Sequence, residues 1–194
     1  MYGRAGRLPK TAVFGAGSNP DEQFVLKSVQ LAELMEIRHC VFIMGPPGSS
    51  SCWKVLCQMK NKIGQQFTHL FPNQSARDDG KVLPTDVNPK SIETSELYGY
   101  VNMATREWKD GLLSMTMRDL GNMPDKNPKW IMLDGDLDAN WIESVNSVMD
   151  DNEILTLPSN ERITLFHHMR LIFEIRDLKH AMPATSSRAG VLFL

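Results

Sequence analysis

Short apolar runs alternate along the chain with longer stretches in which apolar residues recur at helical spacing. Four runs, residues 40–44, 129–134, 170–175 and 190–194, are bounded by polar or turn residues. A strand inside a parallel sheet is covered on both faces and is therefore apolar throughout. The four runs are predicted to be buried strands, and a further short strand is expected within residues 82–87.

Helices are predicted in the segments around these strands. Ser18, Asn19 and Pro20, followed by two acidic residues, are typical of a helix start. This helix is expected to end near Ile37 and to carry an apolar face of Val25, Val29, Ala32 and Met35. A second helix is expected over residues 52–62, with Val55, Leu56 and Met59 inward. A third is expected over 108–120, after a short turn at 95–103. A fourth is expected over 140–149, with Trp141, Val145 and Val148 on one face.

The remaining segments predict one hairpin and two loops. Residues 154–157 and 162–165 flank a Pro-Ser-Asn-Glu turn, which favours a pair of short antiparallel strands. Residues 72–84 and 122–128 are rich in polar residues and contain Pro, as surface loops do. Strands separated by helices predict a three-layer α/β domain with a mostly parallel sheet.

Composition and charge narrow the class of protein. Of the 194 residues, 42% are hydrophobic and 23% charged, which excludes a disordered chain. The 21 basic residues against 23 acidic ones exclude a strongly basic surface for nucleic acid. No apolar run is long enough for a bilayer, and residues 1–17 lack the apolar core of a signal peptide. We therefore expect no nucleic-acid or membrane partner, and a flexible lead-in over residues 1–17.

A degenerate phosphate-binding loop follows the first apolar run. A P-loop has the pattern G-x-x-x-x-G-K-[ST] between a strand and a helix. The matching residues here are Gly45, Pro46, Pro47, Gly48, Ser49, Ser50, Ser51 and Cys52. Gly45 fits, whereas Ser50, Ser51 and Cys52 replace the second Gly, the Lys and the Mg²⁺-binding hydroxyl. Backbone N–H groups at a helix start still attract phosphate, but an ordinary Gly-Pro turn gives the same pattern.

The run at residues 129–134 ends in a carboxylate, as a Walker B strand does. Asp134 would hold Mg²⁺ beside the phosphate loop. The next position, which carries a water-polarising Glu in many ATPases, is Gly135. Asp134, Asp136, Asp138 and Asn140 also have the spacing of a calcium-binding loop. That loop requires Gly at its sixth position and Glu at its twelfth, where this chain has Ala139 and Val145, so calcium is disfavoured.

The cysteines suggest no structural metal. Cys40, Cys52 and Cys57 form no C-x-x-C pair, and no second Cys or His pair has the spacing of zinc ligands. We interpret them as reduced thiols of a cytosolic type of compartment.

The motifs together resemble dynein heavy chains, and specifically the second AAA+ module of the motor ring in its axonemal form. The likeness extends from about residue 20 to 194. The segments that carry it are residues 97–100 (LYGY), 107–112 (EWKDGL), 129–136 (KWIMLDGD), 140–146 (NWIESVN), 148–152 (VMDDN) and 183–190 (PATSSRAG). The resemblance implies the large α/β subdomain of an AAA+ P-loop NTPase, with a five-stranded parallel sheet over residues 18–194. A helical lid subdomain would follow residue 194.

The resemblance also implies site residues and partners. Gly45 to Cys52 and Asp134 would hold ATP or ADP, with Mg²⁺ on Asp134. Glu174 to Arg176 fall near the sensor position, and Arg188 matches an arginine finger that acts on the neighbouring module. Partners would be adjacent AAA+ modules and dynein subunits in the cytoplasm and the ciliary axoneme, with microtubules contacted only through other parts of the motor.

Three functions remain as hypotheses. The first is a regulatory or structural nucleotide-binding module with little or no hydrolysis. The second is a non-enzymatic interaction module that has lost nucleotide binding, as Ser51 and Cys52 suggest. In the third, Lys54 and Asp136 replace the missing groups of an active ATPase.

Overall fold

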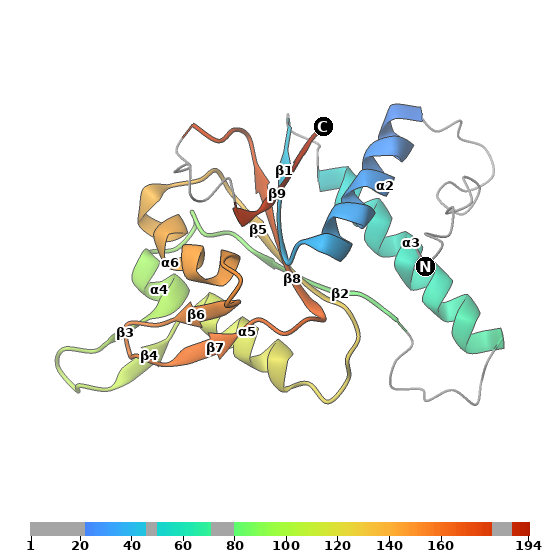
Figure 1. Cartoon of the computed structure of the whole chain (residues 1–194). Helices are drawn as coiled ribbons and strands as arrows, with labels where there is room; N and C mark the ends of the chain where they lie inside the picture. Colours follow the sequence, from blue (N-terminus) through green and yellow to red (C-terminus); the bar gives the residue numbers. More distant parts are fainter. Residues whose placement is uncertain (1–21, 46–49, 71–79, 180–187) are drawn as a thin grey trace.

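The structure, a computed structural model, describes residues 22–45, 50–70, 80–179 and 188–194. Its centre is a five-stranded sheet in the order β2-β5-β8-β1-β9, with every neighbouring pair parallel (Figure 1). The strands are β1 (Cys40–Met44), β2 (Leu83–Val87), β5 (Lys129–Asp134), β8 (Met169–Ile175) and β9 (Gly190–Phe193). All five predicted strands and the predicted fold class are confirmed.

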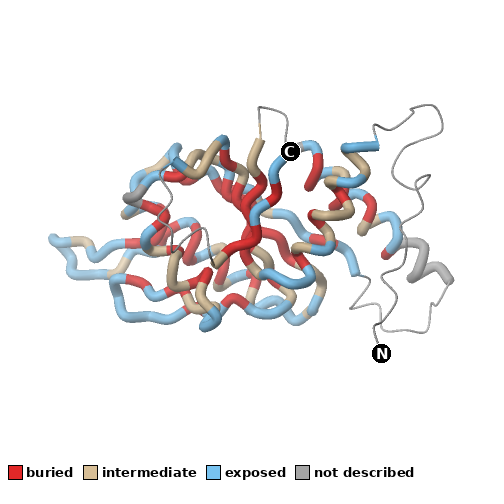
Figure 2. Tube along the Cα trace, turned by 45° about the horizontal axis from the view of Figure 1, so that its top comes forward, coloured by how far each residue is buried: buried red, intermediate tan, exposed pale blue. Residues whose placement is uncertain are grey.

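Helices cover both faces of this sheet. The α2 helix (Glu22–Ile37) and α3 (Ser50–Leu70) lie on one side, and α4 (Thr94–Tyr98), α5 (Leu112–Asn122) and α6 (Ala139–Met149) on the other (Figure 1). A tube coloured by burial shows the central strands as the most buried part of the chain (Figure 2). The result is the three-layer arrangement expected from the sequence.

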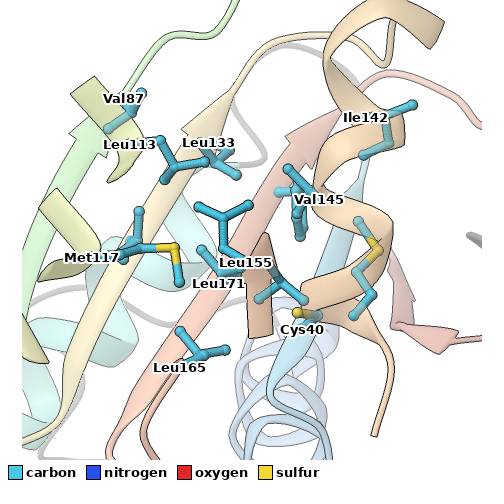
Figure 3. Packing of buried hydrophobic residues seen from close by; sticks show 14 of the residues in the cluster. Cys40, Val87, Leu113, Met117, Leu133, Ile142, Val145, Leu155, Leu165 and Leu171 are labelled. Atoms are coloured by element: carbon cyan, nitrogen blue, oxygen red, sulfur yellow. The ribbon is translucent and has the colours of Figure 1, made fainter. Parts of the chain in front are cut away.

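Alternation along the central strands divides the core in two. On β5, Trp130 and Met132 pack under α2 and α3, whereas Ile131 and Leu133 pack against the opposite cluster. Successive side chains of a strand point to opposite faces, which explains the division. Figure 3 shows the cluster on the second face, where Leu133 and Leu171 meet Val145 of α6.

The α2 helix differs from the prediction in the residues that it buries. The α2 helix buries Ser28, Leu31 and Met35. Of the expected face, Met35 is buried and Ala32 packs against the core, whereas Val25 and Val29 are only half-buried. This helix packs against both α3 and β9, so the side chains that it buries face those two elements. Leu34 lies so close to β9 that a Cβ added at Gly190 would be 2.7 Å from the Leu34 side chain. The expected cap at residues 18–20 lies outside the described residues.

The α3 and α6 helices follow the prediction more closely. In α3, which continues to Leu70, Leu56 and Met59 are buried as expected and Val55 is half-buried. In α6, Trp141, Val145 and Val148 are buried together. No helix of the described segments is long and apolar enough to span a bilayer.

Two antiparallel hairpins lie outside the main sheet. One joins β6 (Ile154–Thr156) to β7 (Arg162–Thr164), as predicted. The other joins β3 (Gly99–Val101) to β4 (Trp108–Asp110). It replaces the first residues of the helix expected over 108–120, which begins only at Leu112.

A pair of glycines closes the base of the β3–β4 hairpin. Gly99 has φ of 107°, a conformation that favours glycine. At Gly111 a Cβ would lie 2.3 Å from the Gly99 nitrogen and 2.4 Å from the Tyr98 carbonyl carbon. The backbone segments approach so closely that no side chain fits between them.

A buried lysine secures the entry to β5. Lys129 is fully buried, and its Nζ donates to the Asp125 carboxylate at 3.0 Å and to the Asp125 carbonyl at 2.8 Å. The hydrogen bond from Lys129 is the main cause that lowers the pKa of Asp125. The loop at residues 122–128 is thereby tied to the first residue of a central strand.

We expect Gly111→Ala to destabilise the domain by more than about 3 kcal/mol, because the new Cβ meets backbone atoms that cannot move independently. Thermal unfolding followed by circular dichroism should show a midpoint lowered by roughly 10 °C. Gly121→Ala is the control, since its Cβ would meet only the ring edge of exposed Phe166 at 2.9 Å. Equal melting of the two variants would contradict the close approach.

We expect Asp125→Asn to reduce the free energy of unfolding by about 2 kcal/mol at pH 7, because a buried cation loses its charged partner. The native pKa of Asp125 lies below its unfolded value of about 3.9. Its contribution is therefore complete above that value and is lost as pH falls through the native pKa. Urea titrations from pH 7 down to pH 2.5 should show that the difference in the free energy of unfolding between the native chain and Asp125→Asn becomes smaller. The exposed carboxylate variant Asp119→Asn should show no comparable gap at any pH.

Candidate functional site

The carboxyl ends of three central strands meet at one edge of the sheet. Gly45, which follows β1, donates its N–H to the Ile175 carbonyl at 3.3 Å, and Gly135, which follows β5, donates to the Glu174 carbonyl at 3.2 Å. Gly45 directly follows β1, and α3 begins at Ser50. The edge predicted to carry ligands is therefore formed by the expected strands. Pro46, Pro47, Gly48 and Ser49 lie outside the described residues.

Two carboxylates stand side by side at this edge. Asp134 is in register with Glu174 of the neighbouring strand β8. By strand alternation Asp134 shares its face with Trp130 and Met132, which pack under α2 and α3. Its side chain is exposed. The predicted Walker B carboxylate thus lies on the face of the sheet that α3 covers. In the predicted P-loop pattern, α3 is the helix that follows the loop.

A tryptophan links α3 to the second carboxylate. The indole N–H of Trp53 donates to Glu174 Oε2 at 3.4 Å, and Trp53 is 6% exposed. The Lys54 Nζ lies 5.4 Å from the centre of the Trp53 ring, at cation–π distance. Lys54, which the third hypothesis makes a stand-in for the P-loop lysine, is exposed and lies against the Trp53 ring.

The first turn of α3 supplies neither a cation nor a hard ligand at the P-loop positions. Ser51 is exposed, and Cys52 is 1% exposed. The Cys52 thiol lies 3.5 Å from the Ser28 hydroxyl of α2, and burial raises the pKa of the thiol. A neutral thiol packed under a helix is a poor partner for Mg²⁺, which prefers oxygen.

Asp136 is held in a second arrangement. Its carboxylate accepts the Arg176 backbone N–H at 3.1 Å and forms an ion pair with Lys90 at 3.6 Å. Lys90, Asp136 and Arg176 line an open cleft of about 490 Å³, together with Leu137, Asp138, Asp177 and Lys179. Leu137 belongs to the core cluster on the α5 and α6 side. The cleft is therefore adjacent to the carboxylate edge, and of the described residues around the β1–α3 connection neither Gly45 nor Cys52 lines it.

The acidic residues after β5 follow separate courses. Asp138 precedes α6, where its carbonyl accepts from the Trp141 and Ile142 amides at 3.2 and 3.1 Å. Among the described segments no three His, Cys, Asp or Glu side chains lie close enough to hold a metal ion together. The calcium-like spacing noted in the sequence corresponds to a strand end followed by a helix start.

Arg188 forms an ion pair within the chain. Its Nε lies 2.5 Å from Asp150 Oδ1, just after α6, and both side chains are 36% exposed. The arginine expected to act on a neighbouring module therefore has a partner of its own. Its action in trans stays a prediction.

Sequence reasoning missed Trp53 and Lys90 as members of this edge. A signal existed for Lys90, because Asn88-Pro89-Lys90 directly follows the predicted strand at residues 82–87, and strand ends of a parallel sheet converge. The inward face predicted for this helix, Val55, Leu56 and Met59, did not include Trp53. Its hydrogen bond to Glu174 joins residues 121 positions apart.

Comparisons with known proteins agree with this geometry. A family model described as an AAA domain of the dynein-related subfamily matches residues 40–189. The dynein alpha chain of the flagellar outer arm of Chlamydomonas reinhardtii is 58% identical over 180 residues, which are 92% of this chain and 4% of that protein. Dynein axonemal heavy chain 17 of Homo sapiens is 49% identical over 188 residues, 97% of this chain and 4% of its own length.

A third relative, the ciliary dynein beta chain of Tripneustes gratilla, is 49% identical over 174 residues, 90% of this chain and again 4% of the relative. This chain thus spans a small part of each heavy chain that it matches. The family match covers four of the five sheet strands and ends directly before β9, and the sheet has the expected parallel order. The chain belongs to the dynein-related subfamily of AAA domains and is similar over most of its length to axonemal dynein heavy chains.

Proposed function

We propose that this chain serves as a nucleotide-binding, non-hydrolysing module of an axonemal dynein motor ring, at the second AAA+ position. The observation that carries the proposal is the exposed Asp134 at the end of β5, at the sheet edge where β1 also ends, followed by Gly135. In this proposal residues 18–194 form the large subdomain and residues 1–17 a lead-in. The helical lid belongs to a longer heavy chain.

The loop from Gly45 to Cys52 would receive the phosphates. Backbone N–H groups at the start of α3, a helix of 21 residues, favour an anion there whatever the side chains are. Asp134 is the group that would hold Mg²⁺, since Cys52 is buried under α2. The ion supplies positive charge that offsets the phosphates, which matters more where the P-loop lysine is absent.

Hydrolysis needs groups that this edge does not supply. A water-polarising carboxylate is absent at Gly135, and Asp136 is engaged by the Arg176 amide and by Lys90. Ser51 provides no cation for the transition-state charge that phosphoryl transfer develops. A bound nucleotide would then act by stabilising the module, as any ligand of the folded state does.

The partners in this proposal are the adjacent AAA+ modules and the other dynein subunits of an axoneme in a cilium or flagellum. The names of the relatives, which are flagellar, ciliary and axonemal dyneins, support this setting. Arg188 would complete the nucleotide site of a neighbouring module after leaving Asp150. Contact with microtubules would belong to other parts of the heavy chain.

A second candidate function is an interaction module without nucleotide. The specific observation in its favour is the Cys52–Ser28 contact, in which the residue at the Mg²⁺ position serves the packing of α3 on α2. Under this alternative the fold contributes only surfaces to the ring.

Titration of the purified chain with fluorescent ATP and Mg²⁺ separates the two candidates. We expect saturable binding that Asp134→Ala weakens by about tenfold, the scale of one charge-assisted contact. Asp119→Ala, which removes an exposed carboxylate from α5, should leave the affinity unchanged. Binding only by a Ser50→Gly/Ser51→Lys/Cys52→Thr variant, and not by the native chain, would favour the interaction module.

Steady-state phosphate release tests the absence of hydrolysis. With saturating Mg·ATP we expect the native chain to release phosphate no faster than Asp134→Ala, because Gly135 carries no carboxylate to activate water. Turnover in the native chain that Asp134→Ala abolishes would overturn this part of the proposal. Lys54→Ala and Asp136→Asn would then identify the substituting groups.

A further inference from the structure

The two hairpins lie near each other beside α5. Figure 1 places β3–β4 and β6–β7 at the same end of the molecule, with α5 next to both. Each hairpin pairs only three residues with three. Isolated two-stranded hairpins of this length are marginally stable, so their position depends on contacts from outside the pair.

Arg118 of α5 contacts both hairpins at once. Its Nη1 and Nη2 donate to the two carboxylate oxygens of Asp110, at the end of β4, at 3.0 and 3.1 Å. Its Nε and Nη2 donate to the two oxygens of Glu161, in the β6–β7 turn, at 3.1 and 2.9 Å. Both contacts are bidentate and together use four of the five guanidinium N–H groups.

The surroundings of Arg118 favour this arrangement over mobile surface pairs. The Arg118 side chain is 27% exposed, less than either carboxylate. The Trp108 indole also donates to Asp110, at 2.8 Å, which fixes that carboxylate from the β4 side. Hydrogen bonds from Arg118 and Trp108 lower the pKa of Asp110. A lysine has no planar fork and could not make both bidentate contacts.

We propose that Arg118 is a positioning residue that clasps the two hairpins into one unit, so that a displacement of either hairpin is transmitted to the other. The clasp consists of Arg118, Asp110 and Glu161. Its two ion pairs join Arg118 of α5 to Asp110 of one hairpin and to Glu161 of the other. The proposal concerns the fold outside the nucleotide edge and holds whether or not the chain binds nucleotide.

Amide hydrogen exchange on the native chain and on Asp110→Asn tests the clasp. The change lies in the β3–β4 hairpin, so a merely local role predicts faster exchange there alone. The clasp predicts that exchange also rises in β6–β7, by roughly three- to tenfold, while β1, β5 and β8 are unaffected. Glu161→Gln should give the reciprocal effect on β3–β4.

Arg162→Gln is the control, because it removes a charge from an exposed residue of β7 outside the clasp. It should leave exchange in β3–β4 unchanged, whereas Arg118→Lys should raise it in both hairpins. Raising the salt from 0.1 to 1 M on the native chain gives a test without mutation, since screening weakens the clasp. The proposal would be overturned if exchange rose only in the hairpin that carries the mutation and if Arg118→Lys changed exchange in neither hairpin.

Discussion

The burial of β1, β5 and β8 on both faces is the constraint from which the other features follow. Their side chains alternate between two apolar clusters, and each cluster needs a helical layer to exclude water. Parallel strands joined through those helices all end at the same edge. Gly45, Asp134 and Glu174 come together there because of the connections, before any ligand is considered.

Features that depend on local periodicity could be predicted from the sequence. The strands, α6 and the β6–β7 hairpin follow from apolar spacing and turn residues. The β3–β4 hairpin could not, because it depends on Gly99 and Gly111 meeting in space. The buried face of α2 is likewise set by two neighbours at once. At the site Asp134 was evident as a strand end, whereas Trp53–Glu174 and Lys90–Asp136 join distant segments.

The departures from the P-loop pattern at the start of α3 are compatible with the packing of this helix. Cys52 and Trp53 both belong to the cluster under α2, beside Leu56 and Ile43. A polar hydroxyl or a lysine is thus not required there for the fold, and a small buried thiol fits well between two helices. A departure from the P-loop residues and retention of the fold are compatible for this reason.

If Arg188 acts on a neighbouring module of a ring, as proposed above, its ion pair with Asp150 has a further consequence. An arginine already held by a carboxylate moves to a neighbouring site only if that site attracts it more strongly. A site filled with a highly charged nucleotide competes well with one partly exposed carboxylate, whereas an empty site does not. Asp150 would therefore hold Arg188 within its own module while the site of the adjacent module is empty. Arg188 would leave Asp150 only when that site contains nucleotide.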